Sequence, residues 1–165
     1  MAILVTQPPE DLIFASLAEL YAQFRGLFIG KEFQCPREIP IVITPNHFFH
    51  LVKLQKGAQT KFTIDFEESL IEATDEGFGE YAIDVSRARR LSWIPEILAE
   101  PHEIWECHEK KTADEMVLRE YDKSGSAFRA VLLKREEDYL KLITSMPMRR
   151  RAVEKLRREG KKLWP

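Results

Sequence analysis

The sequence predicts an α+β fold in which N-terminal helices pack on a C-terminal four-stranded antiparallel β-meander. In the first hundred residues, apolar side chains recur every three or four positions, as in amphipathic helices. After residue 101, four short runs rich in β-branched and aromatic residues follow one another, separated by turn-like segments. Because the helices precede the strands and do not alternate with them, a parallel α/β sheet is not expected.

The N-terminal helices are placed by apolar spacing and by end signals. They are expected over residues 8–30, 44–54, 65–74 and 84–99. Gly30 ends the first helix, Thr44 or Asn46 caps the second, and Pro95 kinks the last or starts a new turn. The run 36–44 lies between prolines and indicates an edge strand or an extended approach to the second helix.

The strands of the meander are expected over residues 102–109, 115–121, 126–134 and 138–146. Asp122–Gly125 has the composition of a hairpin loop. Pro147 begins a final basic helix that ends near Gly160. With 165 residues, we expect a single domain made of an N-terminal helix (1–36), a core (37–147) and the basic C-terminal helix (148–165).

Several protein classes are disfavoured by what the sequence lacks. It contains no glycine-rich phosphate loop, no GxSxG and no HExxH motif, which argues against a nucleotide-binding α/β enzyme, an α/β-hydrolase or a zinc protease. The two cysteines, Cys35 and Cys107, form neither a disulfide framework nor a zinc spacing. No membrane span or signal peptide is recognisable, so we expect a cytoplasmic protein without cofactor or metal.

The charge is unevenly distributed along the chain. Residues 149–165 hold eight cations and two carboxylates, a net charge of +6, so the remainder carries −8 within a total of −2. A basic stretch on an acidic body can bind phosphate groups, and it is equally compatible with an ordinary solvated helix. The acidic body counts against nucleic-acid binding outside a local basic site.

The segment His47-Phe48-Phe49-His50 is the most suggestive for chemistry. On a helix, positions i and i+3 share a face, so the two imidazoles would stand side by side. The positive end of the helix dipole keeps at least one ring neutral, and a neutral and a charged imidazole can serve as base and acid. Two surface histidines without a task, or two metal ligands, are compatible with the same spacing.

Cations and hydroxyls on the predicted strands form a second candidate group. Arg119, Arg129 and Lys134 lie on or near strands, with Tyr121 beside the first, and suit an anionic phosphate. Thr144 and Ser145 end the last strand, where hydroxyls can contact phosphate oxygens. Arg90 and its neighbours open a helix against its dipole, which calls for an anionic partner such as a phosphate or a carboxylate. Ordinary solvent-facing charge is the alternative interpretation of the sheet cations, and plain strand-end residues are the alternative interpretation of the two hydroxyls.

Together the segments HFFH, RARRLSWIPEILAEPHEIWE and AVLLKREEDYLKLITSMP resemble the phage-associated barnase–EndoU–colicin E5/D–RelE-like nucleases over roughly residues 40–147. This resemblance implies helices followed by a four-stranded antiparallel sheet. It also implies an RNA-cleaving toxin or phage-borne nuclease, with RNA as substrate and an immunity protein or antitoxin as a plausible partner. The RNA 2′-OH would attack the phosphate without a metal and leave a 2′,3′-cyclic phosphate.

The residues expected to take part fall into two groups. Catalytic roles are expected for His47, His50, Arg119, Lys134, Thr144 and Ser145. Substrate contacts are expected from Arg90, Tyr121 and Arg129. Two other functions remain open: a non-catalytic phage-derived interaction module, and a metal-dependent hydrolase that uses His47, His50 and a carboxylate such as Glu106.

Overall fold

The protein is described from a computed structural model, which covers residues 7–34, 36–37, 39–45, 47–52, 55–56, 60–61, 81–107, 113–121 and 128–165. The chain forms two compact units. The first, here called the sheet unit, comprises Met1–Glu10, Glu32–Val42 and Trp93–Pro165. The second, the helical unit, comprises Asp11–Lys31 and Ile43–Ser92. The single-domain organisation stays a prediction, and each unit is described by itself.

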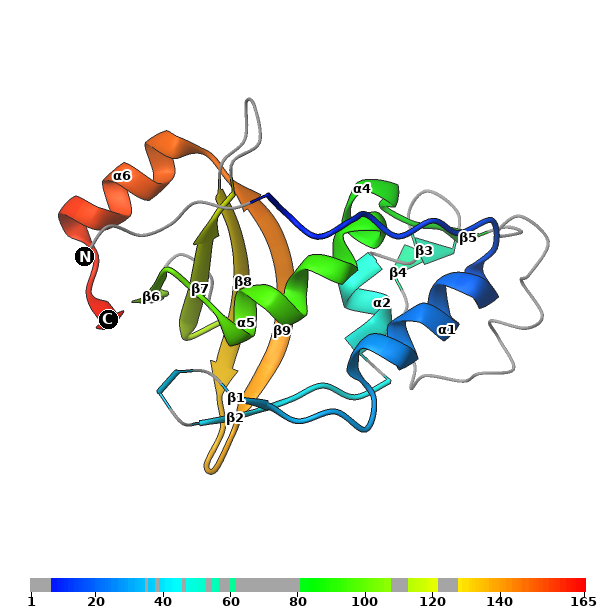
Figure 1. Ribbon diagram of the computed structural model, residues 1–165, viewed down its shortest axis with the longest axis horizontal. Coiled ribbons are helices and arrows are strands. Elements are labelled where there is room, and N and C mark those ends of the chain that lie inside the picture. The colour runs from blue at the N-terminus through cyan, green and yellow to red at the C-terminus, as the bar shows by residue number, and fades with distance from the viewer. Residues whose placement is uncertain are drawn as a thin grey trace. The chain divides into compact units, whose positions relative to one another are not determined.

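The sheet unit is built on a seven-stranded sheet with the order β1-β2-β9-β8-β7-β6-β10. The long, curved strands β7, β8 and β9 lie side by side (Figure 1). Its strands are β1 Phe33–Gln34, β2 Pro40–Val42, β6 Glu103–Glu106, β7 Glu115–Glu120, β8 Phe128–Arg135, β9 Leu140–Met148 and β10 Lys162–Trp164. Strands β6 to β9 pair antiparallel in sequence order, which confirms the predicted meander.

The sheet nevertheless has more strands than the four that the sequence predicts. Strand β2 pairs parallel with β9, and β1 pairs antiparallel with β2. At the other edge, β10 pairs antiparallel with β6. These additional strands have only two or three residues each, which is too short to produce a readable alternation of apolar and polar side chains. The sheet is therefore mixed and extends beyond the meander on both sides.

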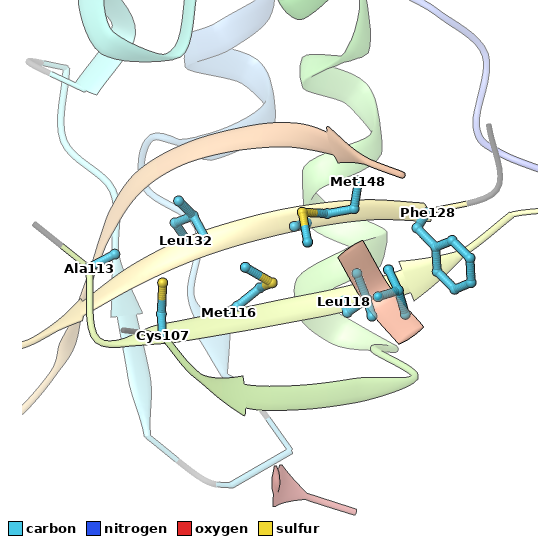
Figure 2. Packing of buried hydrophobic residues seen from close by; sticks show 9 residues of the cluster. Cys107, Ala113, Met116, Leu118, Phe128, Leu132 and Met148 are labelled. Atoms are coloured by element: carbon cyan, nitrogen blue, oxygen red, sulfur yellow. The ribbon is translucent and has the colours of Figure 1, made fainter. Parts of the chain in front are cut away.

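One face of the sheet carries an apolar cluster that helix α6 (Arg150–Glu159) covers. Figure 2 shows its side chains gathered on β7, β8 and the end of β9. Its members include Cys107, Ala113, Met116, Leu118, Phe128, Leu132 and Met148. Helix α6 contributes the buried Val153 and the partly buried Leu156 and so has a packing role on the sheet. The predicted C-terminal helix is confirmed, but it begins at Arg150 and not at Pro147, because β9 continues through Met148.

Helix α5 (Ile94–Ala99) packs on β7 and β8 and carries the buried Ile94, Ile97 and Leu98. Pro95 lies in its first turn, as predicted. The predicted helix over 84–99 is divided into α4 (Val85–Arg89), a 3₁₀ turn η1 (Arg90–Trp93) and α5. The expected packing of N-terminal helices on the meander is therefore seen for α5, whereas α1, α2 and α4 belong to the helical unit.

The helical unit contains α1 (Leu17–Phe28), α2 (His47–Val52) and α4, with a small sheet of β3 (Gln55–Lys56), β4 (Thr60–Lys61) and β5 (Tyr81–Ala82). Helix α1 begins later than predicted, because Ser16 caps it by accepting a hydrogen bond from the Glu19 amide (3.1 Å). It ends before Gly30, whose φ of 74° suits glycine. The helix expected at 65–74 and the hairpin loop at 122–125 lie outside the described residues.

The aromatic side chains of α1 and α2 form the core of the helical unit. The Phe48 ring lies 5.2 Å from the Tyr21 ring in an edge-to-face arrangement and 5.3 Å from the Phe24 ring, centroid to centroid. Aromatic pairs at these separations stabilise a core beyond the area they bury. Phe48 is fully buried, so this residue of the HFFH segment serves packing. No helix in the described part of the chain is long and apolar enough to cross a membrane.

Two buried glutamates tie the layers of the sheet unit together. Glu115 on β7 is 0 % exposed and forms ion pairs with Arg37 and with Arg135, the latter at 2.9 Å from Nε. In register, Glu115 stands opposite Glu106 on β6, an arrangement of like charges that is unfavourable by itself. Arg135 contacts both carboxylates, since its Nη1 lies 3.8 Å from Glu106, and so offsets their repulsion.

The second buried glutamate, Glu103 on β6, anchors helix α6 and β10. Arg157 donates two hydrogen bonds to it, at 3.1 Å from Nε and 2.7 Å from Nη2, and the Lys162 ammonium lies 3.8 Å away. Burial by itself would raise the pKa of Glu103. The hydrogen bonds and charge of Arg157 and the charge of Lys162 outweigh burial and hold this pKa below its ordinary value of 4.5.

This anchor predicts a defined acid sensitivity. Because the folded-state pKa of Glu103 lies below the unfolded one, its contribution is present above about pH 4.5 and is lost as pH falls through the folded value. At neutral pH, Glu103→Gln should lower the free energy of unfolding by about 1–3 kcal/mol, and the difference from the wild type should shrink towards pH 3. Urea unfolding at several pH values measures this. A difference independent of pH would contradict the assignment.

Candidate functional site

Two arginines stand directly opposite each other on the face of the sheet that α5 covers. They are Arg119 on β7 and Arg129 on β8, here called the arginine pair. Their side chains are buried, with 5 % and 2 % of the residue surface exposed. Like charges at opposed positions destabilise a sheet, and burying a cation is costly unless it is compensated. A fold that keeps both cations here concentrates positive charge at one place.

Arg119 is held by the end of helix α5. Its Nη2 lies 3.1 Å from the Glu96 Oε1, and its Nη1 donates a hydrogen bond to the Glu100 carbonyl oxygen. The C-terminal carbonyls of a helix carry partial negative charge, so a guanidinium is favourable at this point. The Arg119 guanidinium also lies over the Tyr121 ring, 5.3 Å from its centroid. Arg119 thus joins the arginine pair to α5.

Arg129 has a different environment. Its Nε donates a hydrogen bond to the Ser145 Oγ (3.2 Å) on β9, and its guanidinium lies 6.0 Å from the centroid of the Trp93 ring. Trp93 meets Tyr121 edge to face at 5.2 Å. The two aromatic rings therefore line the arginine pair. Of the residues predicted from the sequence, the structure brings together Arg119, Tyr121, Arg129 and Ser145. It adds Trp93 and Glu96, which the sequence analysis had not selected.

Ser145 reaches this face because β9 contains an irregularity. Leu133 pairs with Leu142, but the preceding residue of β8, Leu132, pairs with Thr144, so β9 carries one extra residue between them. As a result Thr144 stands opposite Leu132, on the face of the apolar cluster, whereas Ser145 stands opposite Val131 and binds Arg129. The two hydroxyls that the sequence placed together therefore lie on opposite faces of the sheet.

Tyr121 is set up as a hydrogen-bond donor. Burial raises the pKa of its phenol well above the ordinary value, and the negative charge of Glu96 acts in the same direction, while Arg119 opposes them. The phenol therefore keeps its proton at neutral pH. In this state Tyr121 can donate to an anion beside the arginine pair, and it is not suited to act as a base.

His102, at the start of β6, is a neighbour of Arg119 that the sequence analysis had not assigned to the site. Its Nδ1 accepts a hydrogen bond from the Glu120 amide (3.2 Å). Burial and the positive charge of Arg119 lower its pKa, against the opposing effects of Glu120 and Glu103. The ring is therefore neutral at pH 7, with its proton on Nε2. The signal available in the sequence was its position directly after Pro101, at the beginning of a strand.

His47 has a role at the helix terminus. Its side chain is buried, and its Nδ1 accepts a hydrogen bond from the Thr44 amide (2.9 Å), as glutamate or glutamine does in a capping box. Protonating Nδ1 would set two N–H groups against each other, so this bond favours the neutral ring with its proton on Nε2. His50 follows on the same helix, α2, and its side chain lies outside the described part of the structure.

Lys134, another predicted residue, lies away from the arginine pair. It is exposed near the end of β8, opposite Lys141, and the five strand positions between it and Arg129 correspond to about 16 Å. Arg90 is half-buried in η1 and belongs to the helical unit. Among the described residues, no three histidine, cysteine or acidic side chains gather into a metal-binding group, and Cys107 is a buried free thiol.

The described part of the chain combines helices with a sheet whose four central strands form an antiparallel meander, and two buried arginines stand opposite each other on one face of that sheet. The family model described as "phage-Barnase-EndoU-ColicinE5/D-RelE like nuclease2" matches residues 30–165. The chain therefore belongs to this nuclease family, and the resemblance found in the sequence is confirmed. No match to the chain was found among curated proteins or among solved structures.

Proposed function

We propose that this protein is a metal-independent endoribonuclease in which the arginine pair binds the scissile phosphate. The observation that carries the proposal is the placement of Arg119 and Arg129 opposite each other on the sheet of a chain from a nuclease family. Guanidinium groups match the geometry of phosphate oxygens and keep their charge at any working pH. A cytoplasmic location and a neutralising immunity protein or antitoxin belong to the same proposal.

In the proposed reaction the RNA supplies its own nucleophile. The 2′-oxygen forms a bond to phosphorus, the bond to the 5′-oxygen breaks, and a 2′,3′-cyclic phosphate remains. Negative charge grows on the phosphoryl oxygens during this step, so preorganised cations lower the barrier. Arg129 contacts the phosphate. Ser145 positions the Arg129 side chain by accepting a hydrogen bond from the Arg129 Nε. The Tyr121 hydroxyl donates a further hydrogen bond.

Within this proposal, proton transfer is assigned to the histidines of α2, and we choose His50 over His47 for this role. A general base needs a nitrogen lone pair, but the Nδ1 of His47 is used by the Thr44 amide and its Nε2 carries the proton. His47 therefore acts as a cap of α2 in this geometry. We propose that His50, at i+3, takes the proton from the 2′-hydroxyl and delivers it to the leaving 5′-oxygen.

The test is incubation of the pure protein with mixed cellular RNA, with and without EDTA, beside the variants His47→Gln and His50→Gln. Glutamine can replace the capping bond of His47, so this variant should cleave within a few-fold of the wild type. His50→Gln should lose about 10²–10⁴-fold in rate, the usual contribution of a general acid or base. The products should carry 2′,3′-cyclic phosphate ends, which mass spectrometry detects.

Other results would replace parts of this mechanism. Cleavage abolished by EDTA would favour the metal-dependent hydrolase that the HFFH spacing left open. Loss of activity in His47→Gln, with α2 intact by circular dichroism and thermal unfolding, would show that His47 has a chemical role. Intact cleavage in both variants would remove the histidine pair from the reaction.

A further inference from the structure

We propose that the outer face of helix α6 binds the phosphate backbone of single-stranded RNA, apart from the site of cleavage. This face, here called the outer row, consists of Arg151, Lys155 and Arg158. The proposal rests on the proposed function, because it gives that nuclease a second place of contact with its substrate. It concerns binding along the strand and assigns no chemistry to the helix.

The outer row follows from helical geometry. Positions i, i+4 and i+7 fall on one face at 3.6 residues per turn. The opposite face carries Val153 and Leu156, which pack on the apolar cluster of the sheet. All three cations of the outer row are exposed. From Arg151 to Arg158 the helix rises about 10 Å, so the row can follow more than one phosphate along a strand.

The arginines that flank the apolar face of α6 are engaged within the protein. Arg157 binds Glu103, and its guanidinium lies 5.5 Å from the centroid of the Phe128 ring. Arg150 lies 5.3 Å from the same centroid, and its Nη2 is 3.5 Å from Glu120. The outer row differs, because none of its cations forms an ion pair or hydrogen bond with the described residues through its side chain.

The outer row also lowers the stability of helix α6. Arg151 and Lys155 are like charges at i,i+4, which repel each other on a helix surface. Arg151 in addition stands in the first turn, where the helix dipole disfavours a cation. These costs are small individually. Glu154 lies three positions from Arg151 and four from Arg158, and Glu159 lies four positions from Lys155, so these carboxylates offset part of the repulsion. An anionic ligand along the row would offset the rest.

The position of α6 relates the outer row to the arginine pair. Phe128, which Arg150 and Arg157 contact, is the neighbour of Arg129 on β8. Helix α6 therefore lies at the same end of β8 as Arg129, although on the other face of the sheet. An RNA strand that runs from the arginine pair across this end of the sheet would reach α6. Since residues 149–165 carry +6 on a body of −8, the same region also attracts polyanions.

Binding is measured by fluorescence anisotropy with a labelled 2′-O-methyl oligoribonucleotide, which lacks the attacking hydroxyl and stays intact. The variant Arg151→Gln/Lys155→Gln/Arg158→Gln is compared with the wild type. The matched control, Lys31→Gln/Arg89→Gln/Lys141→Gln, removes the same charge at exposed positions elsewhere. Three lost phosphate contacts should make the slope of log K against log salt shallower by about 2, and lower the affinity about 10–100-fold near 0.1 M salt. The control should bind within about threefold of the wild type.

Cleavage assays separate this inference from the proposed function. Against a dinucleotide, which is too short to reach α6, the outer-row variant should cleave like the wild type, whereas its activity on long RNA should fall with its affinity. Absence of any RNA cleavage, together with binding that depends on the outer row, would overturn the proposed function and support this inference. Wild-type affinity in the outer-row variant would overturn the inference about α6. An equal loss of affinity in the control variant, or binding to anionic vesicles in place of RNA, would also overturn it.

Discussion

Arg129→Gln is expected to lower kcat/KM for RNA cleavage by about 10²–10³-fold, the effect of removing one preorganised donor from a developing oxyanion. Arg129 combines the features that this role requires. It stands opposite Arg119, and its orientation is set by Ser145 at 3.2 Å and by the Trp93 ring. The glutamine side chain keeps one donor but loses the charge and the forked geometry. Steady-state kinetics with a short fluorogenic RNA measure the loss.

Two further variants serve as controls for the Arg129→Gln measurement. Arg129→Lys keeps the charge without the planar fork and should recover only part of the activity. Lys141→Gln removes an exposed cation from the neighbouring strand β9 and should leave cleavage unchanged. The free energy of unfolding of each variant is measured by urea titration. If folded Arg129→Gln cleaves within about threefold of the wild type, Arg129 serves packing against Trp93 and the phosphate contact lies elsewhere.

The second large effect is expected for stability. The double variant Arg37→Ala/Arg135→Ala should lower the free energy of unfolding by about 3–5 kcal/mol, because it leaves the fully buried Glu115 without its two cations. Each single variant should cost only about 1 kcal/mol, since one cation still compensates the carboxylate and both arginines are partly exposed. The combined effect should therefore exceed the sum of the single effects.

Adding Glu115→Gln to that double variant tests whether the uncompensated charge of Glu115 causes the loss of stability. The triple variant no longer buries an uncompensated charge, so it should regain most of the lost stability at neutral pH. A double variant whose cost equals the sum of its single costs would show that the two ion pairs act independently and that burial of Glu115 is tolerated.

The meander and the helix that packs on it could be predicted, because each rests on a strong local signal. The strands β7 and β8 contain the apolar runs Met116–Leu118 and Ala130–Leu133, and Pro95 marks the start of α5. The edge strands could not be predicted, since two or three residues pair there only because a neighbouring strand is already in place. Local patterns also did not divide the chain into two compact units, which depends on contacts between distant segments.

The candidate site depends on register, which composition does not determine. If the predicted loop Asp122–Gly125 had set a symmetric hairpin, Arg119 would face Phe128, one position from its actual partner Arg129. A shift by one residue moves every side chain to the other face. The extra residue in β9 acts similarly, since it separates Thr144 from Ser145. The sequence therefore predicts which residue types lie on the sheet, but it does not predict which of them stand opposite each other.

The parallel pairing of β2 with β9 has a consequence for the order of folding. Ile41 pairs with Leu140, about 100 residues downstream, whereas the meander strands pair with their sequence neighbours. Closing the longer loop costs more entropy, so the meander forms first and β2 docks late. By the same reasoning β2 is held by few contacts and detaches at a lower free energy than the central strands. Each such opening uncovers the backbone of β9 and offers it, for that moment, to a strand from another molecule.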